Sequence, residues 1–139
     1  MYLDTSIMVK LYTREPDSAA CERVVAGHSI VSSELLYVEL WSALLAKERA
    51  GGLSPAARQR VWELFEAHLL DELVELVELS GHIVREAAEM IARVHPQVPL
   101  RTLDAIHLAT FAGLEVGPLF TVDRRMIAAA RLLTMPLAR

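Results

Sequence analysis

The chain opens with Met1-Tyr2-Leu3-Asp4-Thr5-Ser6-Ile7-Met8, and its fold begins in this stretch. The first three residues are an apolar run typical of a short strand, which stops at Asp4. Thr5 or Ser6 can then cap a helix, because their side-chain oxygens accept hydrogen bonds from the backbone N–H groups of its first turn. The stretch therefore predicts a strand that leads directly into a helix, with an acidic residue at the junction.

The same alternation continues along the sequence. Further strands are predicted over residues 28–31, 73–79 and 119–122, with a last one near residue 135. Helices are predicted over residues 5–12, 17–27, 32–50, 54–70, 81–94, 102–114 and 123–133. Strands that alternate with helices, without a tight hairpin, indicate parallel crossovers and a sheet covered on both faces. We expect an α/β fold with one domain over residues 1–139, an α/β/α sandwich around a central, mostly parallel sheet of four or five short strands.

Composition excludes several classes of protein. Of the 139 residues, 53% are hydrophobic and 23% charged, which suits a folded core rather than disorder. The longest apolar runs fall far short of the ~20 residues of a membrane span, and the early Asp4 argues against a secretory leader. Cys21 is the only cysteine, which excludes an internal disulfide and a cysteine-rich zinc cluster. We expect a cytoplasmic protein without membrane contact.

Charge is unevenly distributed along the chain. The formal net charge of −4 argues against a protein that simply coats nucleic acid. Residues 61–84 include six acidic residues and no Lys or Arg. A polyanion can therefore meet one face of the molecule and avoid another.

Three of the five aspartates occur next to or within apolar segments, where a carboxylate is unusual. Asp4 and Asp123 each follow an apolar strand, and the ligand crevice of a parallel sheet lies beyond the carboxyl ends of its strands. Asp104 lies within a segment, residues 103–112, that predicts a helix apolar almost all round, where an uncompensated charge costs several kcal/mol. Asp4 and Asp123 can also be simple helix caps, but the three together favour a divalent-cation site.

Glu39 is the fourth acidic candidate. It lies at helical spacing from Leu36, Leu40 and Ala43, on a stripe that should be buried. Glu34 stands at the start of the same helix, where the helix dipole alone explains a carboxylate. We therefore choose Glu39 over Glu34 as the functional residue.

Carboxylates without His or Cys are the ligands that Mg²⁺ or Mn²⁺ prefers. Four crowded carboxylates repel one another, and a cation relieves that repulsion. It also binds phosphate oxygens and lowers the pKa of a bound water. We expect Asp4, Glu39, Asp104 and Asp123 to form a site that hydrolyses a phosphodiester.

The chain resembles the PIN-domain nucleases, through four motifs that occur in order along nearly its whole length. The motifs are Tyr2-Leu3-Asp4-Thr5-Ser6, the helix around Glu39, Leu103-Asp104-Ala105-Ile106-His107-Leu108-Ala109-Thr110, and Phe120-Thr121-Val122-Asp123. The length and the Asp-Ala-Ile-His-Leu-Ala pattern are most similar to VapC toxins.

This resemblance implies a single PIN-like domain that acts as a Mg²⁺-dependent endoribonuclease, the toxin of a type II toxin–antitoxin pair. The implied catalytic and metal-binding residues are Asp4, Glu39, Asp104 and Asp123. Thr5, Ser6 and Thr121 are implied as hydroxyls that orient the ligands or the scissile phosphate. Arg124 or Arg125, directly after the last motif, can contact phosphate instead of lying on a solvated helix face.

Alternative functions are a catalytically silent PIN-like module that binds RNA or protein and a housekeeping RNA-processing nuclease. An aspartyl-phosphate phosphatase is disfavoured, because that chemistry needs a second aspartate two residues after Asp4 and Ser6 stands there. His107, three residues after Asp104, can bond a ligand carboxylate, but we interpret it as a buried structural histidine.

The toxin reading also predicts partners. We expect a VapB-like antitoxin that lays an amphipathic helix against apolar residues of the early helices and runs a basic tail toward Asp4 and Asp104. The apolar residues expected in this groove are Met8, Leu11, Tyr12, Leu36 and Leu40. A homodimer and a higher toxin–antitoxin assembly are expected as well, through helices away from the acidic residues 61–84, because like charges across a two-fold axis repel.

Overall fold

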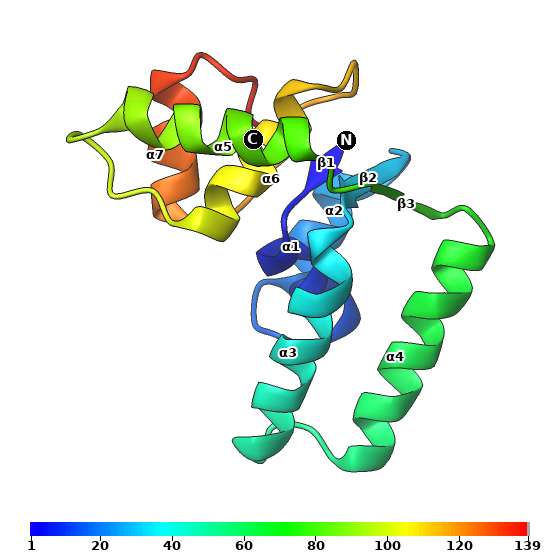
Figure 1. Ribbon diagram of the computed structural model, residues 1–139. Coiled ribbons are helices and arrows are strands. Elements are labelled where there is room, and N and C mark those ends of the chain that lie inside the picture. Colours follow the sequence, from blue (N-terminus) through cyan, green and yellow to red (C-terminus); the bar gives the residue numbers. More distant parts are fainter. Residues whose placement is uncertain (139) are drawn as a thin grey trace.

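A computed structural model describes residues 1–138 of the chain (Figure 1). Within them, seven helices and four short strands follow one another along the sequence. The elements are β1 (Tyr2–Leu3), α1 (Thr5–Tyr12), α2 (Ser18–Val25), β2 (Ile30–Ser33), α3 (Leu35–Arg49), α4 (Pro55–Leu70), β3 (Val74–Val77), α5 (Gly81–Val94), α6 (Thr102–Ala112), β4 (Leu119–Phe120) and α7 (Arg124–Leu132). Among the described residues, no helix is both long and apolar enough to cross a membrane.

The four strands form one sheet in the order β3-β2-β1-β4, with every pair parallel. All their carboxyl ends therefore lie at the same edge of the sheet. The strand expected near Met135 is reduced to a single parallel bridge between Leu119 and Leu137. Thr134, just before it, has a left-handed backbone (φ 57°), and Pro136 has no N–H with which to extend a ladder.

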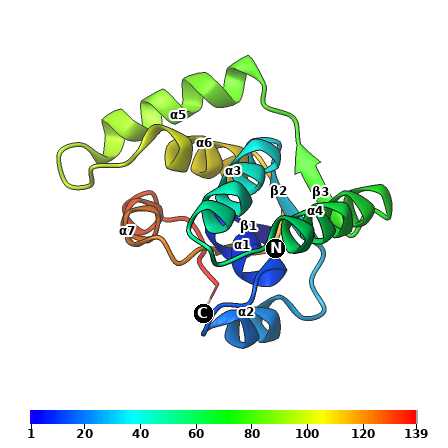
Figure 2. The ribbon, with the colours of Figure 1, turned by 90° about the horizontal axis from the view of Figure 1, so that it is seen from below.

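Helices cover both faces of the sheet, as Figure 2 shows for α5 and α6 on one side and α2 on the other. In β1, Tyr2 faces the core formed with α5, α6 and α7, while Leu3 faces the core formed with α1, α3 and α4. This alternation follows from the period of two in a strand. The predicted α/β/α sandwich with a parallel sheet is confirmed.

The start of α3 differs from the prediction at two serine residues. Ser32 and Ser33 were expected to open the long helix, but both are buried in β2, and α3 begins at Leu35. The Ser32 hydroxyl donates to the carbonyl of Leu3 across the sheet at 2.7 Å. The Ser32 hydroxyl is therefore used in this tertiary contact and does not cap the helix.

The predicted antitoxin groove is wrong in part. Met8, Leu36 and Leu40 are completely buried in the core beneath the α3–α4 hairpin, which projects from the sheet in Figure 1. Leu11 and Tyr12 stay half-buried and border a hollow of about 330 Å³. The sheet with its helices covers more of the apolar surface than the sequence suggested.

Candidate active site

Asp4 lies at the carboxyl end of β1 and is 3% exposed. Ser6 donates to both of its oxygens (2.8 and 2.9 Å), and Thr121 donates to Oδ2 (2.6 Å). Oδ1 also accepts from the backbone N–H of Ile7, so Asp4 itself is the cap of α1 in place of the expected Thr5 or Ser6. Burial raises the pKa of Asp4, although these hydrogen bonds oppose the effect.

Asp123 caps α7 in the same way at the end of the neighbouring strand. Its Oδ1 accepts from the N–H groups of Arg125 (2.7 Å) and Met126 (3.0 Å). Its own N–H donates to the Thr121 hydroxyl, which in turn donates to Asp4. Thr121 therefore joins the two aspartates that follow β1 and β4.

Glu39 reaches the site from α3, the helix that packs on α1. Its Oε2 accepts a hydrogen bond from the Thr5 hydroxyl and another from His107 Nε2 (2.8 Å). Burial raises the pKa of Glu39, but the hydrogen bonds from His107 and Thr5 outweigh it and leave the pKa below its usual value. Glu39 is thus held as a carboxylate.

Asp104 lies in the first turn of α6, and it differs from the other three acids. Its Oδ2 is buried and has no hydrogen-bond partner among residues 1–138. Burial and, next, the negative charge of Asp123 raise its pKa, with a smaller contribution from Glu39 and an opposing one from Arg101. A buried polar atom without a partner marks a position suited to a ligand.

The chemistry of the four acids suits a hard cation such as Mg²⁺ or Mn²⁺. They offer oxygen donors, and the Oδ2 atom of Asp104 lacks the counter-charge that Mg²⁺ or Mn²⁺ would provide. In the described part of the chain, no three acidic, His or Cys side chains already stand close enough to hold one ion together. Mg²⁺ commonly keeps several waters and is held by one or two carboxylates with substrate phosphates, so such an ion does not require a group of three.

The remaining predicted residues have clear places. Glu34 is exposed, and its Oε2 accepts the N–H of Leu79 at 3.1 Å, which ties the start of α3 to the end of β3. Arg124 is exposed at the start of α7, directly after Asp123. Glu34 therefore has a contact outside the site that accounts for it, whereas Glu39 is bonded to Thr5 and His107.

The sequence allowed His107 to bond a ligand carboxylate but favoured a buried structural histidine, and the structure shows both features. The ring is 2% exposed, as expected for a structural histidine, yet it bonds Glu39 on one side and Tyr2 on the other. The available signals were its spacing of three residues from Asp104 and the lone tyrosine in the first strand. Neither signal identifies Glu39, which is 68 residues away.

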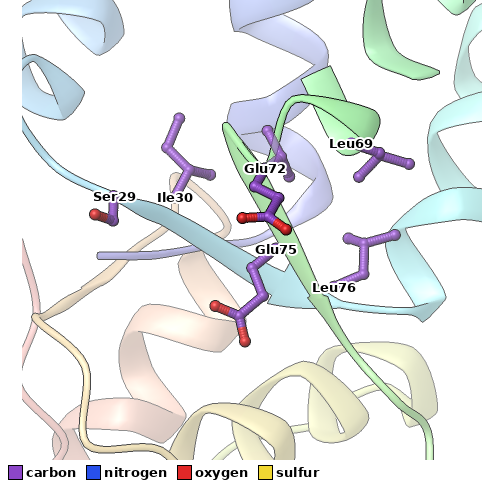
Figure 3. Close-up of a pocket in the computed structure, with 7 residues that line it drawn as sticks. Ser29, Ile30, Leu69, Glu72, Glu75 and Leu76 are labelled. Atoms are coloured by element: carbon purple, nitrogen blue, oxygen red, sulfur yellow. The ribbon is translucent and has the colours of Figure 1, made fainter. Parts of the chain in front are cut away.

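A hollow of about 640 Å³ lies away from these four acids, at the β3 edge of the sheet (Figure 3). Glu72 and Glu75 border it together with apolar residues such as Leu69 and Leu76. None of the four site carboxylates lines it. It combines the acidic character of residues 61–84 with exposed apolar surface.

Comparison with known proteins agrees with this fold. A family model described as the PIN domain matches residues 1–132. The chain is 38% identical over 138 residues to Ribonuclease VapC46 of Mycobacterium tuberculosis, an alignment that covers 97% of this chain and 93% of the relative.

Solved structures with the same fold include VapC20 of Mycobacterium tuberculosis, described as a toxin that cleaves the sarcin–ricin loop. It matches with a TM-score of 0.70 and 19% identity, over 92% of this chain and 93% of that one. VapBC2 of Rickettsia felis, bound to a DNA fragment from its promoter, matches with a TM-score of 0.69 and 16% identity, over 98% and 95% of the two chains. A toxin–antitoxin complex from Klebsiella pneumoniae gives a TM-score of 0.60 at 16% identity, over 91% and 89%.

Proposed function

Because the chain belongs to the PIN domain family, and within it to the VapC type, we propose that it is a divalent-metal-dependent endoribonuclease and the toxin of a toxin–antitoxin pair. The observation that carries the proposal is the set of acids at one edge of the sheet. Asp4 and Asp123 follow adjacent strands. Burial and the negative charges of Asp123 and Glu39 raise the pKa of Asp104. The buried Oδ2 atom of Asp104 lacks a hydrogen-bond partner among residues 1–138.

Asp4, Glu39, Asp104 and Asp123 are the residues that would hold Mg²⁺ or Mn²⁺. When bound, such a cation supplies Lewis acidity and counter-charge for phosphodiester hydrolysis. The chain contributes the orientation of the acids: the Thr5, Ser6 and Thr121 hydroxyls each donate to one of them. We expect Arg124, which is exposed directly after Asp123, to contact an RNA phosphate.

RNA cleavage tests this proposal directly. Purified protein should cut structured RNAs in the presence of Mg²⁺ or Mn²⁺ and should lose this activity in EDTA. Asp4→Asn and Asp123→Asn keep the shape of the side chain and should each lower cleavage by orders of magnitude. Their losses should not add, because ligands of one site act as a unit. Cleavage that continues unchanged in EDTA contradicts the metal-dependent reaction.

Growth separates the toxin from the alternative functions. Expression of the chain alone should slow growth of its host cell, and Asp4→Ala should abolish the effect. Slow growth that persists with Asp4→Ala contradicts a toxin that acts through this site. Harmless expression of an active protein would favour a housekeeping RNA-processing nuclease, and a folded protein without cleavage would favour a silent binding module.

The antitoxin we propose is a VapB-like chain with a basic, amphipathic segment. Three features support it. Apolar residues are exposed on the α3–α4 hairpin and just after it, with Val38 at 61%, Leu70 at 85% and Leu73 at 57%. The acids at the site can receive an arginine from the partner, in competition with the cation. The hollow beside Leu11 and Tyr12 offers a place for an apolar anchor.

We also propose that the chain forms a homodimer, within a larger toxin–antitoxin assembly. The two-fold interface should avoid residues 61–84, whose six acidic residues would face their own copies. Light scattering of the chain alone and with its antitoxin measures both states. A monomer at high concentration contradicts the dimer.

A further inference from the structure

Two buried side chains and one partly buried acid, from three separate elements, form a continuous hydrogen-bonded line into the site. Tyr2 from β1 places its phenol oxygen 2.8 Å from Nδ1 of His107 on α6. Nε2 of the same ring lies 2.8 Å from Oε2 of Glu39 on α3. Tyr2 is fully buried and His107 is 2% exposed. The line therefore lies inside the protein and ends at a site acid.

The chemistry of the partners sets the direction of each hydrogen bond. A carboxylate only accepts, so the proton of a neutral His107 lies on Nε2 and is donated to Glu39. Nδ1 is then an acceptor, and the Tyr2 hydroxyl donates to it. Burial raises the pKa of Tyr2, which keeps this phenol protonated. The order of donation is Tyr2 to His107 to Glu39.

The two oxygens of Glu39 are treated differently. Oε2 receives the hydrogen bonds of both His107 and Thr5, whereas Oε1 receives none within residues 1–138. We infer that His107, supported by Tyr2, is a positioning residue that holds Oε2 and thereby presents Oε1 to the cation and the RNA. This inference rests on the proposed function and adds a specific support for Glu39.

A purely structural histidine does not account for this arrangement. The rest of α6 between Ala105 and Phe111 is buried and largely apolar, and a leucine would fill a similar volume without a polar group to satisfy. The His107 ring instead directs its Nε2 donor to a site acid and its Nδ1 acceptor to the buried hydroxyl of Tyr2. Partners of this kind orient a ligand and set its basicity.

The chain also contains a matched control. Tyr12 and His68 form a second tyrosine–histidine pair, with the phenol oxygen 2.7 Å from Nδ1. In the described residues, no carboxylate bonds Nε2 of His68. Removal of His68 therefore deletes the same kind of contact without a consequence for Glu39.

The test compares His107→Leu, His107→Gln, Tyr2→Phe and His68→Leu with the wild type. His107→Gln keeps an N–H donor near the position of Nε2, and Tyr2→Phe keeps the ring in β1. Three readouts are needed: the affinity for Mn²⁺ by electron paramagnetic resonance, kcat and KM for RNA cleavage, and the proton positions on the histidine rings by ¹⁵N NMR. The His107 signals are those missing from the spectrum of His107→Gln.

We expect the Nε2–H form of His107 in the wild type and a shifted Nδ1 signal in Tyr2→Phe. His107→Leu should lose about 10- to 100-fold in kcat or Mn²⁺ affinity, the usual loss when a ligand's hydrogen-bond partner is removed. KM should change little, and His107→Gln should recover most of the loss. His68→Leu should match the wild type in all three readouts.

Two results overturn the inference alone: an Nδ1–H form in the wild type, or a folded His107→Leu with wild-type Mn²⁺ affinity and kcat. If His107→Leu does not fold, Tyr2→Phe decides, because an unchanged Nδ1 signal there excludes the phenol as its partner. A wild-type protein that neither binds Mn²⁺ nor cuts RNA overturns the proposed function and the inference together.

Discussion

Without a cation, Asp104→Asn is expected to be more stable against unfolding than the wild type. When a cation is present, the variant is expected to be less stable than the wild type. The substitution keeps the shape of the side chain and removes its charge. In the wild type, Oδ2 is buried without a partner among residues 1–138, and the charges of Asp123 and Glu39 oppose ionisation. The folded protein therefore bears a cost at this position that either a bound cation or the loss of the charge relieves.

The size of the effect follows from that cost. The amide of the variant still places a polar atom at the position of Oδ2, so the gain comes only from removing a charge that Asp123 and Glu39 repel. Asp104 is only partly buried as a residue, so solvent screens this repulsion, and a gain of about 1 kcal/mol, the upper end for exposed charge pairs, is expected. For a chain of this size, that gain raises the melting temperature by about 3 °C.

Magnesium should reverse the order of the two proteins. At a free Mg²⁺ concentration of about 100 times Kd, the wild type gains about 2.7 kcal/mol. The variant should lose most of this gain, because one of the acids that hold the ion no longer has a charge. Thermal unfolding of both proteins in EDTA and across a Mg²⁺ titration measures the crossing directly.

Glu89→Gln is the control for the loss of one negative charge. Glu89 is exposed on α5, and a substitution there should change the free energy of unfolding by less than about 0.5 kcal/mol with or without Mg²⁺. The reasoning fails if Asp104→Asn melts below the wild type in EDTA. It also fails if the variant gains as much from Mg²⁺ as the wild type does.

Two further predictions concern other acids. Glu39→Gln should lower kcat for RNA cleavage by orders of magnitude, while Glu34→Gln should keep it near the wild-type value; equal losses would refute the choice between them. The ammonium groups of Lys10 and Lys47 lower the pKa of Glu15 below its ordinary 4.5, so this carboxylate contributes stability above pH 4.5 that is lost as the pH falls through the lower folded value. Urea unfolding should therefore show Glu15→Gln less stable than the wild type at neutral pH and closer to it in acid; a constant difference would exclude this titration.

The sequence predicted best those elements whose ends carry local signals. The helix Gly81–Val94 was predicted with its observed bounds, because Ser80 caps its start and His95-Pro96 ends it. Ser54 and Pro55 marked the start of α4 equally well. Such signals act over a few residues, so the sequence alone contains them.

Several of the errors arise from contacts between distant segments, unlike the missing strand near Met135, which has a local cause. At the first helix, Asp4, Thr5 and Ser6 are all good caps, and propensity alone does not separate them. Asp4 takes the position because Thr121, 117 residues away, and Ser6 both bond its carboxylate. The hydrogen bond from His107 to Glu39 depends in the same way on how α6 packs against the rest of the domain.

The donors around the acids explain how the site can be ordered and still attract a cation. Asp4 and Glu39 are held by hydroxyls, a backbone N–H and a histidine ring, and not by the permanent charge of a lysine or arginine. Within residues 1–138, Lys and Arg pair with other acids, such as Glu15 and Glu48. A lysine or arginine bonded to Asp4 would give firmer electrostatic support but would compete with Mg²⁺ for the same oxygens. Support without lysine or arginine therefore keeps the negative charge of the site available to a cation, and the buried Oδ2 of Asp104 is the atom left without a partner among residues 1–138.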